Sequence, residues 1–149
     1  MASKLLAKYC RLVGTEYLKQ TLLPVIAQIS PDCSYEMDPD KIKGGTVEFN
    51  TLNVKSLAQD FLDAIIKSIP KMPVQFRILT HYLGEVVKAK YPDHPYFGIV
   101  NLIFLRFFCV ALAAPASFGI VPTNIQGPEA KRGLISVSKV IQTLANGAL

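Results

Sequence analysis

Arg106 is the residue whose chemistry most needs an explanation, because it lies inside an almost wholly apolar run, residues 97–114. If that run is a buried helix, an unpaired guanidinium there would be very costly, so Arg106 must have partners. Its planar fork of N–H donors can hold several carbonyls or a carboxylate at once. We expect that partner to come from another helix, a loop or a second molecule. Arg106 is then either a structural clamp on a loop or an arginine at a binding face. The neighbours at helical spacing, which offer no counter-charge, are Leu102, Ile103, Cys109 and Val110.

The apolar run itself allows two interpretations. It has 18 residues, which is about the lower length of a membrane span. A central Arg costs roughly 2.5–3.5 kcal/mol for insertion into a bilayer, and Asn101 adds to that cost. A helix that is apolar all round is also what the centre of a helical domain requires. Because the surrounding predicted helices are amphipathic, we expect a buried core helix, with a membrane span as the alternative.

A second group of side chains follows one face of the last predicted helix, which Pro128 and Glu129 open. The stripe is either a solvated face or a docking surface. Its members are Arg132, Ile135, Lys139, Gln142 and Asn146, opposite the apolar residues Leu134, Val137, Ile141 and Leu144.

Other kinds of chemistry are excluded by composition and spacing. The three cysteines are far apart and form no CxxC pair, which fits a reducing compartment, and two isolated histidines make a zinc cluster untenable. The formal net charge is +5 without a block of like charges, which argues against a nucleic-acid-binding tail. A chain of 149 residues that is 50% hydrophobic predicts one folded domain or part of one.

The elements that must position these residues are predicted to be helices. Apolar side chains recur every three or four residues, and no run alternates long enough for a convincing strand. Gly14 is expected to interrupt or end the first helix, and Pro24 to kink the second or lie in its first turn. The result is an all-α fold of about six helices in a single domain. The predicted helices are 3–12, 16–29, 55–69, 73–90, 97–114 and one that begins at Pro128, with loops at 30–50 and 116–127.

The fourth predicted helix has an apolar stripe that we expect to be buried. Pro73 suits its first turn, and the sequence 91–95 ends it. The stripe comprises Phe76, Leu79, Tyr82, Leu83, Val86 and Val87.

Four sequence pieces, in this order, resemble the Ras GTPase-activating (RasGAP) domain. The first is TEYLKQTLLPVIAQI followed by Glu36-Met37-Asp38-Pro39, and the second is IPKMPVQFR ahead of the helix ending in KAKYP. The third and most specific is FLRFFC, residues 104–109, running to Pro115 and then FGI. The fourth is KVIQTLAN, residues 139–146. Together these pieces cover nearly the whole chain.

The resemblance implies an all-α protein that acts on a Ras-class small GTPase in its GTP-bound form. The family supplies an arginine finger in trans, whose guanidinium opposes the negative charge that spreads over the transferring phosphoryl group. We therefore expect a regulator of another enzyme with no active site of its own. The resemblance implies no metal, cofactor, nucleic acid or transmembrane segment, and a cytoplasmic location with any membrane recruitment left to flanking regions.

The resemblance also assigns roles to matched positions. Arg106, in the FLR motif, is expected to brace the loop that carries the finger, and Leu105 to lie at the groove facing the GTPase. Lys139, Gln142 and Asn146 match the last motif and are expected to face the switch regions of the GTPase.

The sequence departs from the family pattern at the finger. In the family the finger arginine precedes a segment like Ala2-Ser3-Lys4-Leu5, and we expect it to be absent from residues 1–149. The positions compared and found not to match it are Arg11, Arg77, Arg106 and Arg132.

Three further departures affect the details. The family's domain continues past the LAN tripeptide at 144–146, so residues 1–149 are expected to form a partial RasGAP domain. Val110 stands where the family prefers proline, and Ile135 at a position that is basic in some members. Two functions follow, a GTPase activator with doubtful catalysis or a finger-less GTPase-binding module. A membrane or purely structural helical protein is a weaker third.

Overall fold

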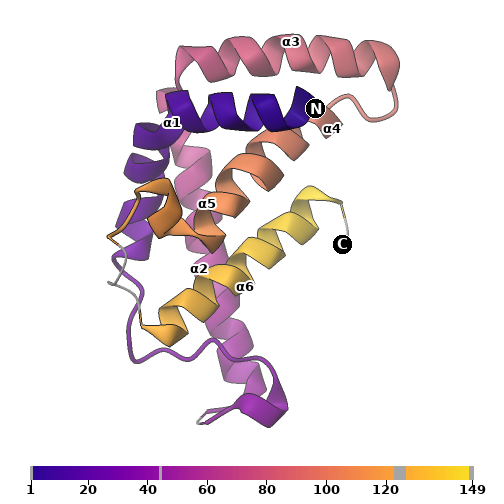
Figure 1. Ribbon diagram of the computed structural model, residues 1–149. Coiled ribbons are helices and arrows are strands. Elements are labelled where there is room, and N and C mark those ends of the chain that lie inside the picture. The colour runs from indigo at the N-terminus through magenta and orange to yellow at the C-terminus, as the bar shows by residue number, and fades with distance from the viewer. Residues whose placement is uncertain (1, 44, 123–126, 148–149) are drawn as a thin grey trace.

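The computed structural model describes residues 2–43, 45–122 and 127–147, and within them the chain is helical with no strand. The predicted all-α class is confirmed (Figure 1). Short 3₁₀ turns at Pro39–Lys41, Ile69–Lys71 and Pro115–Phe118 join the longer elements. The α-helices are α1 (Ala2–Ile26), α2 (Val47–Ser68), α3 (Val74–Lys90), α4 (Phe97–Val100), α5 (Cys109–Ala113) and α6 (Pro128–Ala145).

Helix α1 joins the first two predicted helices into one, so the expected interruption at Gly14 is wrong. Gly14 is buried, and a Cβ atom there would lie 2.6 Å from ring carbons of both Phe76 and Phe107. The glycine therefore serves the close approach of two rings and does not end the helix. Pro24 lies in the last turn of α1. Figure 1 shows that α1 changes direction along its length, so its two halves have different neighbours.

An aromatic cluster under Gly14 holds the centre of the molecule together. The ring centroids of Phe76 and Phe107 are 4.8 Å apart at 71°, and those of Phe107 and Phe108 are 5.2 Å apart. Tyr17 packs against all three rings, and its hydroxyl lies 2.6 Å from the Oγ of Ser68 at the end of α2. Helices α1, α2, α3 and the 97–113 segment thus meet at one aromatic cluster, in which the Tyr17–Phe107 pair is stacked and the other pairs are edge-to-face.

The apolar run forms a continuous helix, which we call the FLR helix (residues 97–113): α4, then a π-helix at Asn101–Phe108, then α5. Its inner face is buried, as expected, and includes Leu102, Ile103, Phe107, Phe108 and Leu112. The run is not covered all round, however, because Phe97 and Val110 are exposed. Among the described helices, none has the length and apolar character needed to cross a bilayer.

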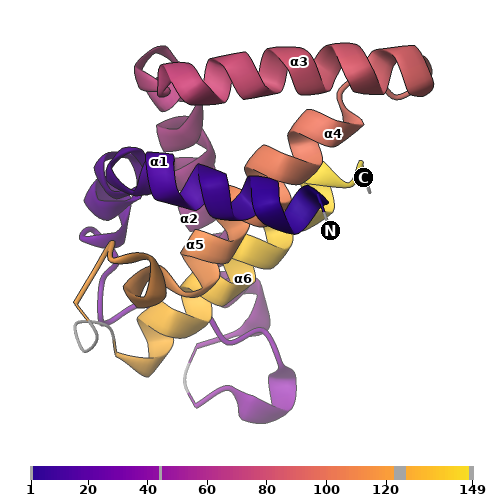
Figure 2. The ribbon, with the colours of Figure 1, turned by 45° about the horizontal axis from the view of Figure 1, so that its top comes forward.

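Helix α3 packs differently from the prediction. Phe76 is its fully buried residue, whereas Tyr82 and Val86, which were expected in the buried stripe, are each 65% exposed. Figure 2 shows α3 along one edge of the molecule, with α4 below it. The contact with α4 is close at Gly98, where a Cβ would lie 2.6 Å from a methyl of Val87. One face of α3 therefore has a neighbour and the opposite face has none among the described residues.

Helix α2 begins earlier than predicted, at Val47. The side chain of Thr46 accepts a hydrogen bond from the backbone N–H of Phe49 and so caps the helix. The prediction missed residues 47–54 because Asn50, a polar residue, occupies a buried position on the inner face and interrupts the apolar pattern. In the predicted loop 116–127, the first residues form a 3₁₀ turn and residues 123–126 lie outside the described part of the chain.

Candidate functional site

Arg106 is exposed, which contradicts the expectation of a buried guanidinium. Its Nε donates a hydrogen bond of 3.1 Å to Oδ1 of Asn101, a residue of the same helix. In a π-helix the residues five apart lie on one face, whereas the sequence-based search considered neighbours three and four apart. The change of helical register therefore explains both the missed partner and the wrong prediction that the partner lies on another element.

The other residues of the FLR motif are buried to different degrees. Leu105 is half-buried, while Phe107 and Phe108 point into the core. The motif therefore presents Arg106 outward from a segment that its aromatic neighbours fix in place.

The stripe on α6 lies where the sequence pattern placed it. Lys139 and Asn146 are exposed and Gln142 is half-buried, whereas Leu134, Val137 and Ile141 opposite them are buried. Asn146 also ends the helix, since its backbone N–H bonds the carbonyl of Gln142. Leu144, expected on the apolar side, is 42% exposed.

A chain of hydrogen bonds joins the two motifs. The Nε2 of Gln142 donates to Oγ of Ser138 at 3.1 Å, and that hydroxyl donates to the backbone carbonyl of Cys109 at 3.0 Å. Figure 1 shows the FLR helix and α6 side by side and running in opposite directions. Antiparallel packing through Ser138 and Cys109 brings Arg106, one turn before Cys109, to the level of Gln142, one turn after Ser138. We call the five residues that the two motifs contribute the FLR–α6 seam: Leu105, Arg106, Lys139, Gln142 and Asn146.

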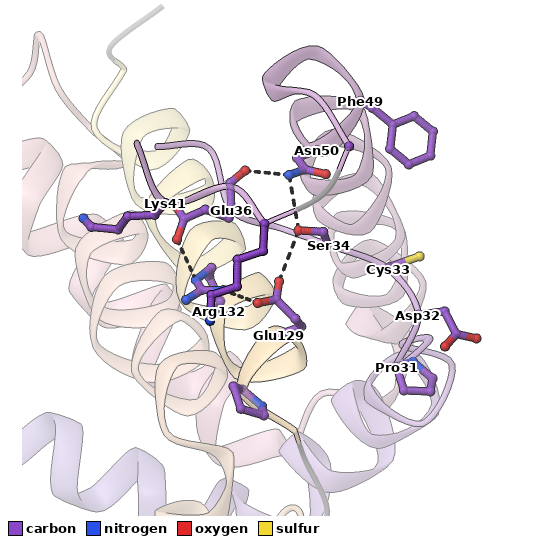
Figure 3. Close-up of a pocket in the computed structure, with 13 residues that line it drawn as sticks. Pro31, Asp32, Cys33, Ser34, Glu36, Lys41, Phe49, Asn50, Glu129 and Arg132 are labelled. Atoms are coloured by element: carbon purple, nitrogen blue, oxygen red, sulfur yellow. Dashed lines mark hydrogen bonds and ion pairs between the residues drawn. The ribbon is translucent and has the colours of Figure 1, made fainter. Parts of the chain in front are cut away.

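A different arginine clamps a loop. Arg132, expected on the solvated stripe, lies between two carboxylates: its Nε is 3.1 Å from Oε2 of Glu36, and its Nη1 pairs with Oε1 of Glu129 (Figure 3). Glu36 belongs to the loop 27–46 and Glu129 to the first turn of α6. The clamp role that the sequence analysis considered for Arg106 is thus carried, for this loop, by Arg132.

The same loop is held by further contacts to α2 and α6. The Nδ2 of Asn50 donates to the carbonyl of Glu36 at 2.7 Å and to Oγ of Ser34 at 3.2 Å (Figure 3). The backbone N–H of Tyr35 donates to Glu129 at 3.2 Å. That bond, followed by the charge of Arg132, lowers the pKa of the Glu129 carboxyl below its ordinary value. Burial of Tyr35 against α6 raises the pKa of its hydroxyl to about 12.

A pocket of about 630 Å³ lies between this loop, α2 and α6 (Figure 3). Its charged lining is balanced, with Lys41, Lys43 and Arg132 against Asp32, Glu36 and Glu129. Among the residues that the structure describes, no group of three or more His, Cys, Asp or Glu side chains is arranged to hold a metal ion. The pocket is therefore best explained as the open side of the loop clamp.

The two remaining arginines also have partners within the chain. A terminal nitrogen of Arg11 donates to the carbonyl of Ser117, and its guanidinium carbon lies 4.3 Å from the centroid of the Phe118 ring. The Nη2 of Arg77 donates to the carbonyl of Pro70 at 2.6 Å. Arg11 thereby ties α1 to the turn that follows the FLR helix.

The chain is similar to a family of GTPase-activating proteins and to several of its members. The family model described as GTPase-activator protein for Ras-like GTPase matches residues 45–146. A probable Ras GTPase-activating-like protein, ngap, from Dictyostelium discoideum is 34% identical over 98% of this chain and 17% of its own length. Human Ras GTPase-activating protein 2 is 33% identical over 98% of the chain and 18% of its own length. A GTPase-activating protein of Drosophila melanogaster is 33% identical over 98% of the chain and 13% of its own length. The chain thus spans less than a fifth of the length of these relatives.

Proposed function

This chain belongs to the family of GTPase-activator proteins for Ras-like GTPases, and we propose that it binds a Ras-class small GTPase in its GTP-bound form and regulates GTP hydrolysis by that protein. Two of the relatives named above carry Ras GTPase-activating names, and the match to each of them extends over 98% of this chain. The proposed partner surface is the FLR–α6 seam.

The observation that supports this surface most directly is the pairing of the two motifs on adjacent helices. Residues far apart in the sequence, Arg106 and Gln142, come to the same level of the bundle through the bond between Ser138 and Cys109. Arg106 and Lys139 are both exposed there, which gives the seam two cations for an acidic partner surface. Such charges steer association and set orientation more than they add affinity.

Each seam residue has a proposed role. Arg106 braces the loop that carries an arginine finger, and Leu105 contributes to the groove facing the GTPase. Lys139, Gln142 and Asn146 contact the switch regions of the GTPase. The chain contributes no active site of its own: the chemistry is that of the GTPase, and the activator stabilises the charge that develops on the transferring phosphoryl group. We place this regulation in the cytoplasm, with flanking regions responsible for any recruitment to a membrane.

A second function, binding of GTP-loaded GTPase without activation, is favoured by the state of the arginines. Each of the four has a partner inside the chain: Ser117 and Phe118 for Arg11, Pro70 for Arg77, Asn101 for Arg106, and two glutamates for Arg132. A finger must reach into another protein's active site, and an arginine with an internal partner would first have to leave it. Residues 1–149 in this second case hold the GTPase without switching it off.

Binding is tested with a Ras-class protein loaded with a non-hydrolysable GTP analogue. We expect Lys139→Ala and Asn146→Ala each to weaken binding roughly 5- to 10-fold, since each removes one polar contact at the interface. Lys55→Ala, an exposed lysine on α2, is the matched control and should bind like the parent. Equal affinity of all three variants would remove the FLR–α6 seam as the docking surface.

Catalysis is tested by single-turnover GTP hydrolysis with saturating chain. Less than about 100-fold acceleration is expected from the 149 residues, because a finger arginine is worth roughly 10³–10⁵ in rate in the Ras–GAP system that defines this value. A larger acceleration would exclude the binding module and show that one of the four arginines leaves its internal partner.

A further inference from the structure

Helix α3 has two apolar faces, and one of them has no neighbour among the described residues. The inner face packs on α4, where a Cβ at Gly98 would lie 2.6 Å from a methyl of Val87 and 3.2 Å from the side chain of Leu83. The outer face consists of side chains four residues apart, which therefore follow one stripe along the helix. Each of them is more than half exposed: Val74, Ile78, Tyr82 and Val86.

Exposed apolar side chains are concentrated in this part of the molecule. Nine of the eighteen large apolar side chains that are exposed in the described structure lie within residues 66–97. Three of the nine are tyrosines, whose rings are apolar and whose hydroxyls can stay in water. Figures 1 and 2 both show α3 along one edge of the molecule, with no other helix on its outer side. The nine are Ile66, Ile69, Val74, Ile78, Tyr82, Val86, Tyr91, Tyr96 and Phe97.

The same segment carries most of the net positive charge. Residues 67–97 contain five lysines or arginines against two carboxylates, a net charge of +3 out of the +5 of the whole chain. Lys90 continues the outer stripe of α3 by one more turn, and its Nζ lies 5.7 Å from the centroid of the Tyr91 ring. Cations and apolar side chains are thus exposed together along α3. All five cations are exposed: Lys67, Lys71, Arg77, Lys88 and Lys90.

The shape and charge of this surface favour a bilayer over other partners. The five cavities with volumes of about 150–630 Å³ are lined by residues of other elements, whereas small molecules bind in concave pockets and helical peptides in grooves. A second copy that docked through the same face would place two positive surfaces opposite each other, which is unfavourable. A bilayer needs no groove, accepts apolar side chains below its headgroups, and supplies negative charge when it contains anionic lipid.

We propose that the outer face of α3 is a peripheral membrane-binding surface, which lies on a bilayer that contains anionic lipid. The apolar stripe enters the headgroup region, with the hydroxyl of Tyr82 in its hydrated layer, and Lys88 and Lys90 reach the negative groups of the lipid. A surface of this size binds weakly, so it orients a chain that flanking regions bring to the membrane. The inference goes beyond the proposed function and does not depend on it.

The test uses vesicles of phosphatidylcholine, with and without about 30% phosphatidylserine, and measures the bound fraction of the chain by sedimentation. We expect at least about 10-fold stronger binding to the anionic vesicles, and a decrease as salt is added. Lys88→Ala/Lys90→Ala should weaken this binding roughly 10- to 25-fold, about 5-fold for each lysine. Tyr82→Ser/Val86→Ser should weaken it by a similar factor, because it removes the apolar area that enters the headgroups.

The matched control is Leu52→Ser/Lys55→Ala, which changes an exposed leucine and an exposed lysine on α2 and should bind like the parent. A tryptophan reporter then locates the contact, because the chain contains no tryptophan. The emission of Tyr82→Trp should shift to shorter wavelength when anionic vesicles are added. Phe49→Trp, at a position on α2 that is 59% exposed, should show no shift.

The proposal is supported if binding requires phosphatidylserine, falls in both α3 variants and shifts the emission at position 82 alone. Absence of binding, equal binding to both kinds of vesicle, or an equal loss in the α2 control would overturn it. A dimer in solution that Tyr82→Ser/Val86→Ser dissociates would also overturn it, because the face would then belong to a second copy. No GTPase is present in these assays, so their failure is separate from a failure of the proposed function.

Discussion

Two phenylalanines of the FLR helix illustrate the contrast between the two sides of this molecule. Phe107 is 1% exposed in the aromatic cluster, whereas Phe97 in α4 is 64% exposed. We call the first region the central cluster (Gly14, Tyr17, Phe76, Phe107 and Phe108). We call the second the α3 edge, and its exposed apolar residues are Val74, Ile78, Tyr82, Val86 and Phe97.

Similar amphipathic helices are buried to different extents in the two regions, according to the number of neighbouring elements. In the central cluster, four helical segments meet and cover a side chain from every direction. Along the α3 edge, α4 covers one face, and Tyr82 and Val86 on the other face meet no described residue that buries them. Exposed apolar stripes of this kind mark surfaces that can bind another surface or promote aggregation.

The largest expected difference between the regions is in the cost of removing a phenyl ring. Phe107→Ala should lower the free energy of unfolding by about 3–5 kcal/mol, because it leaves a cavity in a packed core. Phe97→Ala, on the same helix, should change it by about 0.5 kcal/mol or less, because its ring is mostly in water. Urea unfolding followed by circular dichroism measures both. Similar losses in the two variants would show that the α3 edge is as well covered as the central cluster.

Substitutions at two glycines, one in each region, should show the same contrast with smaller changes in stability. Gly14→Ala places a Cβ 2.6 Å from two rings and should destabilise the fold by about 1–2 kcal/mol, although alanine favours helix by about 1 kcal/mol. Gly84→Ala on α3 places its Cβ 3.3 Å from the end of the Ile99 side chain, which can move. That variant should be neutral or stabilised by up to about 1 kcal/mol. Thermal unfolding of the two variants measures both effects. A higher unfolding temperature for Gly14→Ala would contradict the close contact at Gly14.

The ion pairs of Arg132 with Glu36 and Glu129 attach residues 27–43 of the loop to the well-packed side of the molecule. Arg132→Gln removes the cation between Glu36 and Glu129 and should cost about 0.5–1 kcal/mol, since these ion pairs are partly exposed. Trypsin cleavage after Lys41 and Lys43 should become faster because the loop opens more often. Arg77→Gln on α3 is the matched control. Equal cleavage rates in both variants would show that Arg132 does not restrain the loop.

The smallest effect expected is a pH dependence from Glu129. Its pKa is lowered by the Tyr35 N–H and then by Arg132, so the ionised form stabilises the fold at neutral pH. This contribution is lost as the pH falls through the lowered pKa, below about pH 4.5. The urea midpoint of the parent should therefore fall slightly more between pH 6 and pH 3 than that of Glu129→Gln. An identical decrease in both would contradict the lowered pKa.

Much of the fold could be predicted from periodicity, and the failures have identifiable causes. The stripe opposite Leu134, Val137 and Ile141 lies at the surface as predicted, because α6 is amphipathic with a simple 3.6-residue period. The expected burial of Tyr82 failed because an amphipathic pattern does not count the neighbours a helix has. The predicted break at Gly14 is wrong because nothing in the local sequence reveals that two rings from distant segments need its space.

Within the candidate site, the sequence identified the residue types but not their partners. The sequence identifies Arg106 as the unusual cation. The predictions that it is buried and that its partner lies on another element are wrong. The acceptor, Asn101, lies in the same run, where its amide adds to the predicted cost of membrane insertion. Arg132 was placed on a solvated stripe, and its two carboxylate partners, separated from each other by most of the chain, could not be paired from spacing.

The sequence by itself determined the helical class, the positions of most helices, and the FLR and KVIQTLAN motifs that match the Ras GTPase-activator family, because these depend on local periodicity and on short contiguous patterns. The tertiary structure decided which helix faces are covered, which arginine clamps a loop, and the π register that brings Asn101 to Arg106. Those features depend on the packing of side chains from segments far apart in the chain, and the packing energy of such contacts is not a property of any one segment.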